Sequence, residues 1–314
     1  MQMRWLYRGT AIAAGLGLLV LPLGASRYLL FLLYLIFMDI SLAQSWNLVG
    51  GYTGLISLGH AAFFGLGAYT AAILIRRLGV PFLPSALAGG LVAAAFSAVI
   101  AVPTFRFRGI YFAIGSLILA EALRIWMINW ELTGGAQGIS LPAGGAPGLT
   151  EFYYIMLLIA AGSTALLVVI LRTKLGVGLR AIRDNEEVAQ NMGVNTFRTK
   201  LYAFMLSAFI TGLTGGVHAA RLGVIEPYSI FSAVRTISTV NTVIIGGMGT
   251  VFGPILGAVF ITLLSEGLAE FYTFHLMITG LIFILVIRFV PSGMWGRIRT
   301  SRLVGRIGQA VTVE

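Results

Sequence analysis

The chain has 314 residues, of which 58% are hydrophobic and 10% are charged, and its formal net charge at pH 7 is +10. A soluble domain is typically about 45–50% apolar and about 25% charged, so this composition excludes an ordinary soluble protein. There is no cysteine, which excludes disulfides, thiol redox chemistry and cysteine-ligated metals. The basic residues lie mostly between apolar runs, so we attribute the positive charge to membrane orientation and expect no nucleic-acid partner.

Successive apolar runs have the length that crosses a bilayer, roughly 17–25 residues, and predict an all-α, polytopic membrane protein with about ten transmembrane helices. The predicted spans are 10–25, 28–48, 53–75, 82–103, 109–128, 152–171, 201–221, 233–250, 251–268 and 272–290. One of the pair 233–250 and 251–268 could instead be re-entrant. The basic N-terminus would also suit a cleavable signal peptide, but the many later spans favour an uncleaved first helix.

The basic residues also predict which side of the membrane each loop faces. With the N-terminus in the cytoplasm, fifteen of the 21 Lys and Arg fall in inside segments. The six others lie at outer ends or within spans: Arg27, Arg76, Arg77, Arg124, Arg221 and Arg235. Cytoplasmic loops carry an excess of Lys and Arg, so we expect both termini in the cytoplasm, with Arg76 and Arg77 as exceptions to the pattern.

Two long connections interrupt the single transmembrane domain, 1–314, and they differ in kind. Residues 129–151 are rich in Gly and Pro, contain no Lys or Arg, and are expected on the outer, periplasmic side. Residues 172–200 are charged throughout and are expected in the cytoplasm. The second connection is therefore the one that a soluble cytoplasmic partner would reach.

Two apolar stretches, 51–72 and 244–260, are unusually rich in glycine. Helices in lipid pack closely through small residues, so such stretches predict tight helix contacts. The small residues in and beside the first stretch are Gly50, Gly54, Gly59, Gly65, Gly67, Ala61, Ala62 and Ala68. Residues 51–54 would form a break between two helices. Each stretch follows an asparagine, Asn47 or Asn241, and paired interruptions of this kind point to a translocation path, although composition alone could produce so short a likeness.

Ionisable residues within the spans are candidate functional residues because charge at membrane depth is costly. Asp39 is the only acid in its apolar run and is the best candidate for a polar contact inside the bundle. Glu121 and Arg124 stand three residues apart on one predicted helix, where they are expected to neutralise each other. Glu266 and Glu270 lie near a predicted outer end, where we expect solvent exposure.

The histidines do not indicate a catalytic or metal site. His60 could line a pore or relay protons, but a hydrogen bond to a neighbouring helix is the simpler expectation. His60, His218 and His275 are dispersed, and no metal-spaced ligands or paired acids converge with them. The chain also lacks the phosphate-binding pattern G-x-x-x-x-G-K-[ST]. We therefore expect neither an enzyme nor a bound metal or cofactor.

The cytoplasmic connection contains a short helix with clear start and stop signals. Asp184 or Asn185 can cap a helix whose first turn carries Glu186 and Glu187, and Gly193 is placed just after its end. A helix of about two turns is unstable alone in water, so its flanking spans or a partner should hold it. It also carries apolar residues that a solvated linker would not need: Val188, Ala189 and Met192.

Together these segments resemble the inner-membrane permease subunits of ABC importers for branched-chain amino acids, of the LivM/LivH type. The resemblance covers most of the chain and rests on NLVGGYTGLISLGHAAFFGLGAY (47–69), FRFRGIYFAIGSL (105–117), GLRAIRDNEEVAQNMGVN (178–195), KLYAF (200–204) and GGMGTVFGPILGA (246–258). The outer-loop piece GGAQGI (134–139) is more similar to the LivM side of the family.

The resemblance implies the ABC importer permease fold and a role in alternating access. It implies a second permease subunit, favoured to be a paralogue, two cytoplasmic ATPase subunits that use the ATP, and a periplasmic binding protein. It makes 178–195 the coupling helix that docks on the ATPase, with Ala181, Arg183, Asp184, Glu186, Glu187, Ala189 and Gly193 in that role. The expected residues of the translocation path or gate are Asp39, Asn47, Tyr52, Ser57, His60 and Asn241.

Two alternatives remain open on the sequence alone. Relatives of this family also take urea, short amides or aromatic acids, and the permease sequence does not separate these substrates. A stand-alone ion-coupled carrier or channel would instead need no ATP and would place an ion site around Asp39 or Glu266.

Overall fold

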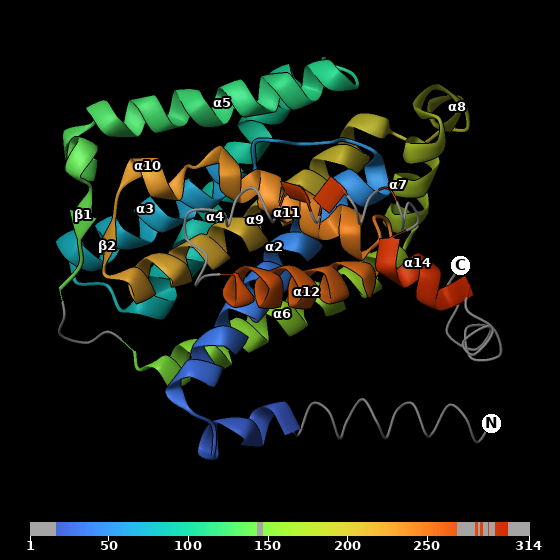
Figure 1. Cartoon of the computed structure of the whole chain (residues 1–314). Helices are drawn as coiled ribbons and strands as arrows, with labels where there is room; N and C mark the ends of the chain where they lie inside the picture. Colours follow the sequence, from blue (N-terminus) through green and yellow to red (C-terminus); the bar gives the residue numbers. More distant parts are fainter. Residues whose placement is uncertain are drawn as a thin grey trace.

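The computed structural model describes residues 17–142, 147–268, 280–281, 283–284, 288 and 293–300. These residues are almost entirely helical, as predicted (Figure 1). The longer helices are α2 (Arg27–Thr53), α3 (His60–Leu78), α4 (Phe82–Thr104), α5 (Ile110–Asn129), α6 (Leu149–Leu171), α7 (Lys174–Asp184), α9 (Thr196–Leu222), α11 (Ala233–Gly246) and α12 (Gly253–Gly267). The short elements are η1 (Leu21–Leu23), η2 (Glu131–Thr133), η3 (Gly135–Gln137), β1 (Ile139–Ser140), α8 (Glu186–Asn191), β2 (Val224–Ile225), α10 (Pro227–Ile230) and α14 (Gly293–Thr300).

Seven stretches of the described chain are long and apolar enough to cross a membrane. They are α2, α3, α4, α5, α6, α9 and the segment Pro227–Gly246, which joins α10 to α11. The apolar helix α12 is shorter than a usual span. The predicted number of ten is not confirmed, because residues 10–16 of the predicted span 10–25 and most of the span 272–290 fall outside the described residues.

The predicted boundary between the second and third spans is wrong. α2 continues to Thr53 and α3 begins only at His60, so the interruption lies at 54–59 and not at 51–54. The Trp46 ring fills the space into which a side chain at position 50 would project, so Gly50 serves packing within the helix. Gly54 ends α2 with a φ of 76°, which glycine adopts without steric cost.

The two long connections lie at opposite ends of the molecule (Figure 1). At one end, β1 pairs antiparallel with β2, with Ile139 opposite Ile225 and Ser140 opposite Val224. This pairing joins the 129–148 connection to the segment after α9, and Arg76 at the end of α3 donates to the carbonyl of Ser140 at 3.2 Å. At the other end lie α7, α8 and α14. The long helices therefore run between the end that carries β1 and β2 and the end that carries α7, α8 and α14.

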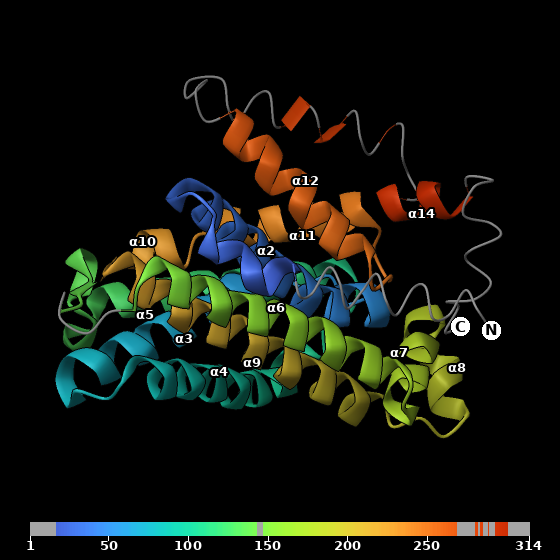
Figure 2. The same cartoon turned by 90° about the horizontal axis from the view of Figure 1, so that it is seen from below.

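Small residues let α9 lie directly against α3 and α4 (Figure 2). A Cβ at Gly67 of α3 would meet the carbonyl oxygen of Gly212 of α9, and one at Gly89 of α4 would lie 2.5 Å from the carbonyl oxygen of Gly67. Each glycine thus removes a side chain that would hold two backbones apart. This confirms the expectation that the first glycine-rich stretch serves close helix packing.

Candidate translocation and coupling sites

The short helix α8 has the start and stop signals that its sequence predicts. The Asn185 side chain accepts hydrogen bonds from the backbone N–H groups of Glu187 and Val188, at 3.0 and 3.1 Å. Glu186 and Glu187 occupy the first turn, where carboxylates favour the positive end of the helix dipole. Gly193 follows the helix with a φ of 87°. Of the two predicted caps, Asn185 and not Asp184 is the one used.

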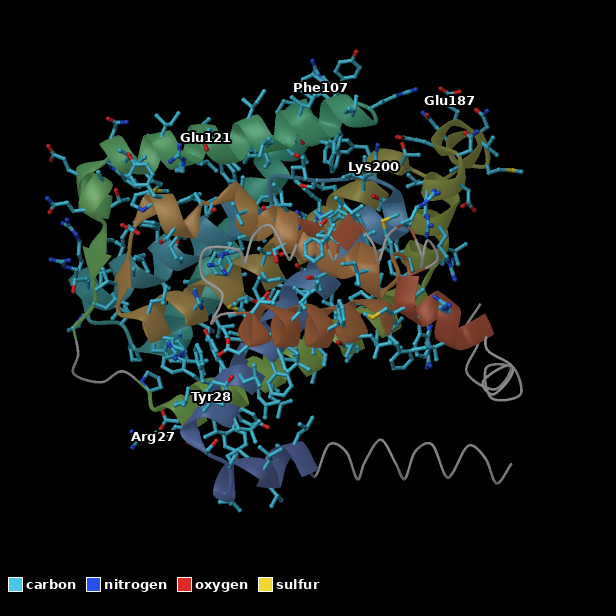
Figure 3. All side chains as sticks on the ribbon, viewed as in Figure 1. Arg27, Tyr28, Phe107, Glu121, Glu187 and Lys200 are labelled. Atoms are coloured by element: carbon cyan, nitrogen blue, oxygen red, sulfur yellow. The ribbon has the colours of Figure 1, made fainter. Side chains whose placement is uncertain are left out.

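Two ion pairs hold α8 against the rest of the chain. Glu187 accepts from Arg108, in the connection between α4 and α5, at 3.0 Å, and both side chains are largely exposed. Glu186 accepts from Lys200 of α9 at 2.6 Å, and the Lys200 side chain is only 6% exposed. Figure 3 places Glu187 and Lys200 toward the same end of the molecule. The buried Lys200 pair is the firmer attachment, because exposed pairs contribute little.

The surface of α8 is divided between anchoring and exposed residues. Ala189 is 3% exposed and packs inward, so it anchors the helix and is not available to a partner. Val188 and Met192 are 52% and 81% exposed, so both apolar side chains are open to a partner. A hollow beside them is lined by Gln190, Gly193, Val194, Asn195, Thr196 and Phe197. Among the predicted docking residues, Ala181 and Glu186 are half-buried, and the exposed ones are Arg183, Asp184, Glu187 and Gly193.

Arg183 of α7 touches both glycine-rich interruptions. A Cβ at Gly249, in the turn between α11 and α12, would meet the Arg183 Nη1 atom, and one at Gly54 would lie 3.7 Å from its Cγ. Asn47 of α2 completes this junction: its Oδ1 accepts from the Gly249 N–H at 2.9 Å and its Nδ2 donates to the Thr250 carbonyl at 2.8 Å. We call these residues the junction. It connects α7 to the C-terminal ends of α2 and α11.

The non-helical segment 54–59 is held by three different helices. Trp46 of α2 donates from Nε1 to the Ser57 carbonyl at 2.8 Å, and the Leu58 N–H donates to Ser116 of α5 at 2.9 Å. His60 hydrogen-bonds the Ser57 hydroxyl at 3.2 Å and Ser207 of α9 at 2.9 Å. The predicted hydrogen bond from His60 to a neighbouring helix is confirmed.

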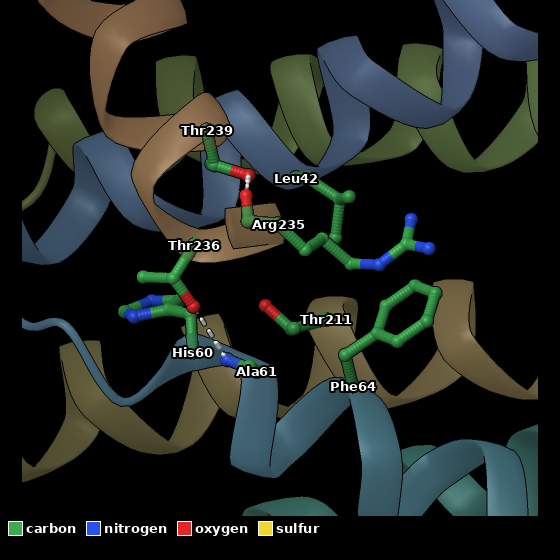
Figure 4. Close-up of a pocket in the computed structure, with 8 residues that line it drawn as sticks. All are labelled: Leu42, His60, Ala61, Phe64, Thr211, Arg235, Thr236 and Thr239. Carbon is green, nitrogen blue, oxygen red and sulfur yellow. Dashed lines mark hydrogen bonds between the residues drawn. The ribbon is translucent and has the colours of Figure 1, made fainter. Parts of the chain in front are cut away.

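A small pocket lies beside this segment, between α2, α3, α9 and α11 (Figure 4). Its walls are Leu42, His60, Ala61, Phe64, Thr211, Arg235, Thr236 and Thr239. The Thr236 hydroxyl accepts from the Ala61 N–H at 2.9 Å and joins α11 to α3. The volume open to the centre of a water molecule is about 10 Å³, which suits roughly one water. An amino acid would enter only after these helices move apart.

The other predicted path residues lie in separate places. Asp39 accepts a hydrogen bond from Thr262 of α12 at 2.7 Å, so its predicted polar contact within the bundle is confirmed. Tyr52 is buried near the end of α2, and Asn241 is half-buried on α11. The structure therefore brings Ser57 and His60 together but does not gather the predicted set into one site.

Several charged residues within the spans are paired or packed. Glu121 and Arg124 form the predicted ion pair on α5. Glu270 and His275 lie outside the described residues. Sequence reasoning placed Arg221 and Arg235 at outer ends or within spans and gave them no role, although arginine at membrane depth was the available signal. Within the described chain, no three His, Asp or Glu residues come together as metal ligands.

Residues 28–287 match the family described as the permease component of branched-chain amino acid transport systems. The chain belongs to this family. It is 32% identical over 285 residues to the high-affinity branched-chain amino acid transport system permease protein LivM of Salmonella typhimurium LT2, covering 81% of this chain and 67% of the relative. The LivM protein of Escherichia coli K12 is 31% identical over 303 residues, covering 87% of this permease and 71% of the relative.

The LivH permease of Escherichia coli K12 is more distant, at 23% identity over 304 residues, which cover 87% of this permease and 98% of LivH. The expected likeness to LivM more than to LivH is therefore confirmed. No solved structure matches the chain. The permease is thus a multi-pass helical membrane protein of a family of transport components.

Proposed function

We propose that this permease is the membrane-spanning subunit of an ATP-driven, binding-protein-dependent importer that moves branched-chain or similar small amino acids across the bacterial inner membrane. The family match over 28–287 carries the proposal. The proposed partners are a paralogous permease subunit, two cytoplasmic ATPase subunits that use the ATP, and a periplasmic binding protein. Both termini and α8 would face the cytoplasm, and the 129–148 connection would face the periplasm.

The coupling role of α7 and α8 is supported by their contacts. The exposed apolar side chains of Val188 and Met192 suit a groove on a soluble partner. Arg183 lies against Gly54 and Gly249, so a movement of α7 would reach the ends of α2 and α11 directly. Docking of the ATPases on α8 would in this way shift the helices that wall the pocket beside His60. We propose that these contacts carry the movement of the ATPases to the pocket and so produce alternating access.

Co-purification tests the coupling role. The permease would be purified through an affinity tag together with its co-expressed ATPases, comparing wild type with Glu187→Arg. We expect wild type to retain the ATPases and Glu187→Arg to lose most of them, because the reversal places a cation on the exposed face of α8. Wild type that never retains an ATPase would contradict the proposed function.

The ion pair with Arg108 provides a matched control. Arg108→Glu breaks the same pair without changing α8, and the double variant Arg108→Glu, Glu187→Arg can form it again. If the α8 surface itself docks, Arg108→Glu keeps the ATPases and the double variant does not recover them. Recovery in the double variant would show that the pair, and not the docking surface, is what matters.

ATP dependence separates the proposed importer from its alternatives. In proteoliposomes with binding protein, uptake of labelled leucine should require ATP inside and should not respond to a proton or sodium gradient. Uptake of urea, a short amide or an aromatic acid in place of leucine would support an ATP-driven importer with a different substrate. Gradient-driven uptake without ATP would instead favour an ion-coupled carrier.

A further inference from the structure

Two arginines of membrane-length segments lie among aromatic rings. Arg221 is in the last turn of α9, and its Cζ lies 4.7 Å from the ring centre of Phe31 and 5.2 Å from that of Tyr34. Arg235 is in the first turn of α11, and its Cζ lies 4.5 Å from the ring centre of Phe64. Both guanidinium groups therefore sit over aromatic faces inside membrane-length helices.

His218 connects the two arginine environments. Its Nδ1 hydrogen-bonds the Tyr34 hydroxyl at 3.0 Å, and its ring lies 5.7 Å from that of Phe64. The wall formed by Tyr34, His218 and Phe64 is thus continuous from Arg221 to Arg235. On the other side of Phe64 lies the pocket beside His60, and the Arg235 side chain extends past Phe64 (Figure 4).

Neither arginine forms an ion pair with an acid in the described part of the chain. The ion pairs within the described part of the chain join Arg108 to Glu187, Arg124 to Glu121 and Lys200 to Glu186, so neither Arg221 nor Arg235 belongs to one. The Nε–H groups of both are buried without a hydrogen-bond partner among the described residues. Asp39 acts electrostatically on Arg235, but within the described chain it forms no ion pair with that guanidinium, and its hydrogen bond comes from Thr262.

Two arginines inside the membrane without ion-pair partners among the described residues raise the free energy of the folded protein unless a ligand binds them. An arginine in a membrane span is energetically costly, and contact with aromatic faces offsets only part of that cost. Burying a polar N–H without an acceptor adds a further cost, so a buried unsatisfied donor needs an explanation. A planar guanidinium matches a carboxylate through two parallel hydrogen bonds.

We propose that Arg235, with Arg221 beside it, binds the α-carboxylate of the transported amino acid on its way through the permease. This inference rests on the proposed function and adds to it the group of the substrate that the membrane subunit recognises. The hydroxyls of Thr211, Thr236 and Thr239 lie around the same pocket and supply neutral polar partners. The apolar walls Leu42 and Phe64 suit a hydrocarbon side chain. The Thr236–Ala61 hydrogen bond joins α11 to α3 at this pocket. Separation of the two helices at this bond would open the pocket and admit the ligand.

The test measures binding to the assembled transporter without its binding protein, since the binding protein would reject substrate analogues first. The purified complex in nanodiscs is probed by saturation-transfer NMR with L-leucine and with L-leucinamide, which lacks the carboxylate. We expect leucine to bind about tenfold more tightly than leucinamide, the size expected for a charge-assisted pair. Arg235→Gln should remove this preference, and Arg235→Lys should keep part of it.

Arg77→Gln is the matched control, because it removes the same charge from an exposed arginine in the last turn of α3, away from the pocket beside His60. It should leave the preference for leucine unchanged. Equal binding of leucine and leucinamide by wild type, or a preference that survives both Arg235→Gln and Arg221→Gln, would overturn the inference.

A lipid phosphate is the other anion that such a site could hold. Native mass spectrometry of nanodiscs that contain phosphatidylglycerol would then show lipid retained by wild type and lost in Arg235→Gln, with an unchanged leucine signal, and this result would overturn the inference. ATP-driven leucine uptake by the same wild-type sample keeps the two hypotheses apart. Normal uptake without a preference for the carboxylate would contradict the proposed binding site alone. Absence of uptake would contradict the proposed function.

Discussion

At the scale of single residues, Gly249 of the junction is constrained both by its backbone angle and by its neighbours. Gly249 has a φ of 76°, and the Arg183 guanidinium fills the space beside its Cα. Gly51 lies on the other side, and a Cβ at Gly249 would be 3.1 Å from its carbonyl oxygen. A larger residue therefore requires the Arg183 side chain to move aside, and it crowds the end of α2.

We predict that Gly249→Ala uncouples the permease. The left-handed backbone alone costs about 1–2 kcal/mol for alanine, and the new methyl group also pushes the Arg183 side chain away from Gly249. ATP hydrolysis by the assembled complex should continue while leucine uptake per ATP falls several-fold. Gly79→Ala is the control, because Gly79 has a φ of 62° but no atom within 4 Å of its Cβ position. Equal uptake losses in the two variants would assign the effect to backbone strain and not to the junction.

At the scale of the helices, the packing of α3, α4 and α9 relies on glycines that let the backbones approach, more than on buried apolar area. Lipid is as apolar as a helix surface, so burial does not by itself drive helices together. The short distance between the backbones of α3 and α9, set at Gly67 and Gly212, supplies the packing contact instead.

Gly67→Val should separate α3 from α9. Overpacking of this kind typically costs about 1–3 kcal/mol, and here the obstacle is the backbone of Gly212, which cannot rotate away. The expected result is a lower unfolding temperature of the detergent-solubilised permease, measured by fluorescence-detected size exclusion. Gly162→Val on α6 places the same side chain where nothing lies within 4 Å, and it should change stability little. If both variants unfolded like wild type, the close approach would not be a source of stability.

At the scale of the whole molecule, the two ends have different chemistry. One end carries the β1–β2 pair and the Gly- and Pro-rich connection, and the other carries α7, α8 and their ion pairs (Figure 1). On the positive-inside rule, we propose that the second end faces the cytoplasm. Arg76 and Arg77, the exceptions to that rule, lie at the first end, where Arg76 bonds the Ser140 carbonyl.

The absence of cysteine makes this orientation directly measurable. Leu132→Cys and Met192→Cys replace exposed residues at the two ends, 39% and 81% exposed. A membrane-impermeant maleimide should label Leu132→Cys in intact spheroplasts and should label Met192→Cys only after permeabilisation. The reverse pattern would invert the proposed topology, and labelling of both in intact spheroplasts would show that the two ends are not separated by the membrane.

The sequence by itself determined the features that local chemistry controls. Span length and hydrophobicity predicted the membrane helices, Asn185 and Gly193 predicted the ends of α8, and the order of long motifs predicted the family. The position of the break after α2 was missed, because glycine weakens a helix but does not decide whether a neighbouring ring, here that of Trp46, packs against it.

Only the tertiary structure decided which residues meet. Asn47 reaches Gly249 and Thr250 more than two hundred positions later, and Arg183 lies between two glycines that no periodicity connects. Arg221 and Arg235 became a candidate site through the aromatic rings around them and the lack of a paired acid. Such sites depend on distances between helices, which arise from packing of the whole bundle, whereas hydrophobic pattern and caps act within a few residues of the chain.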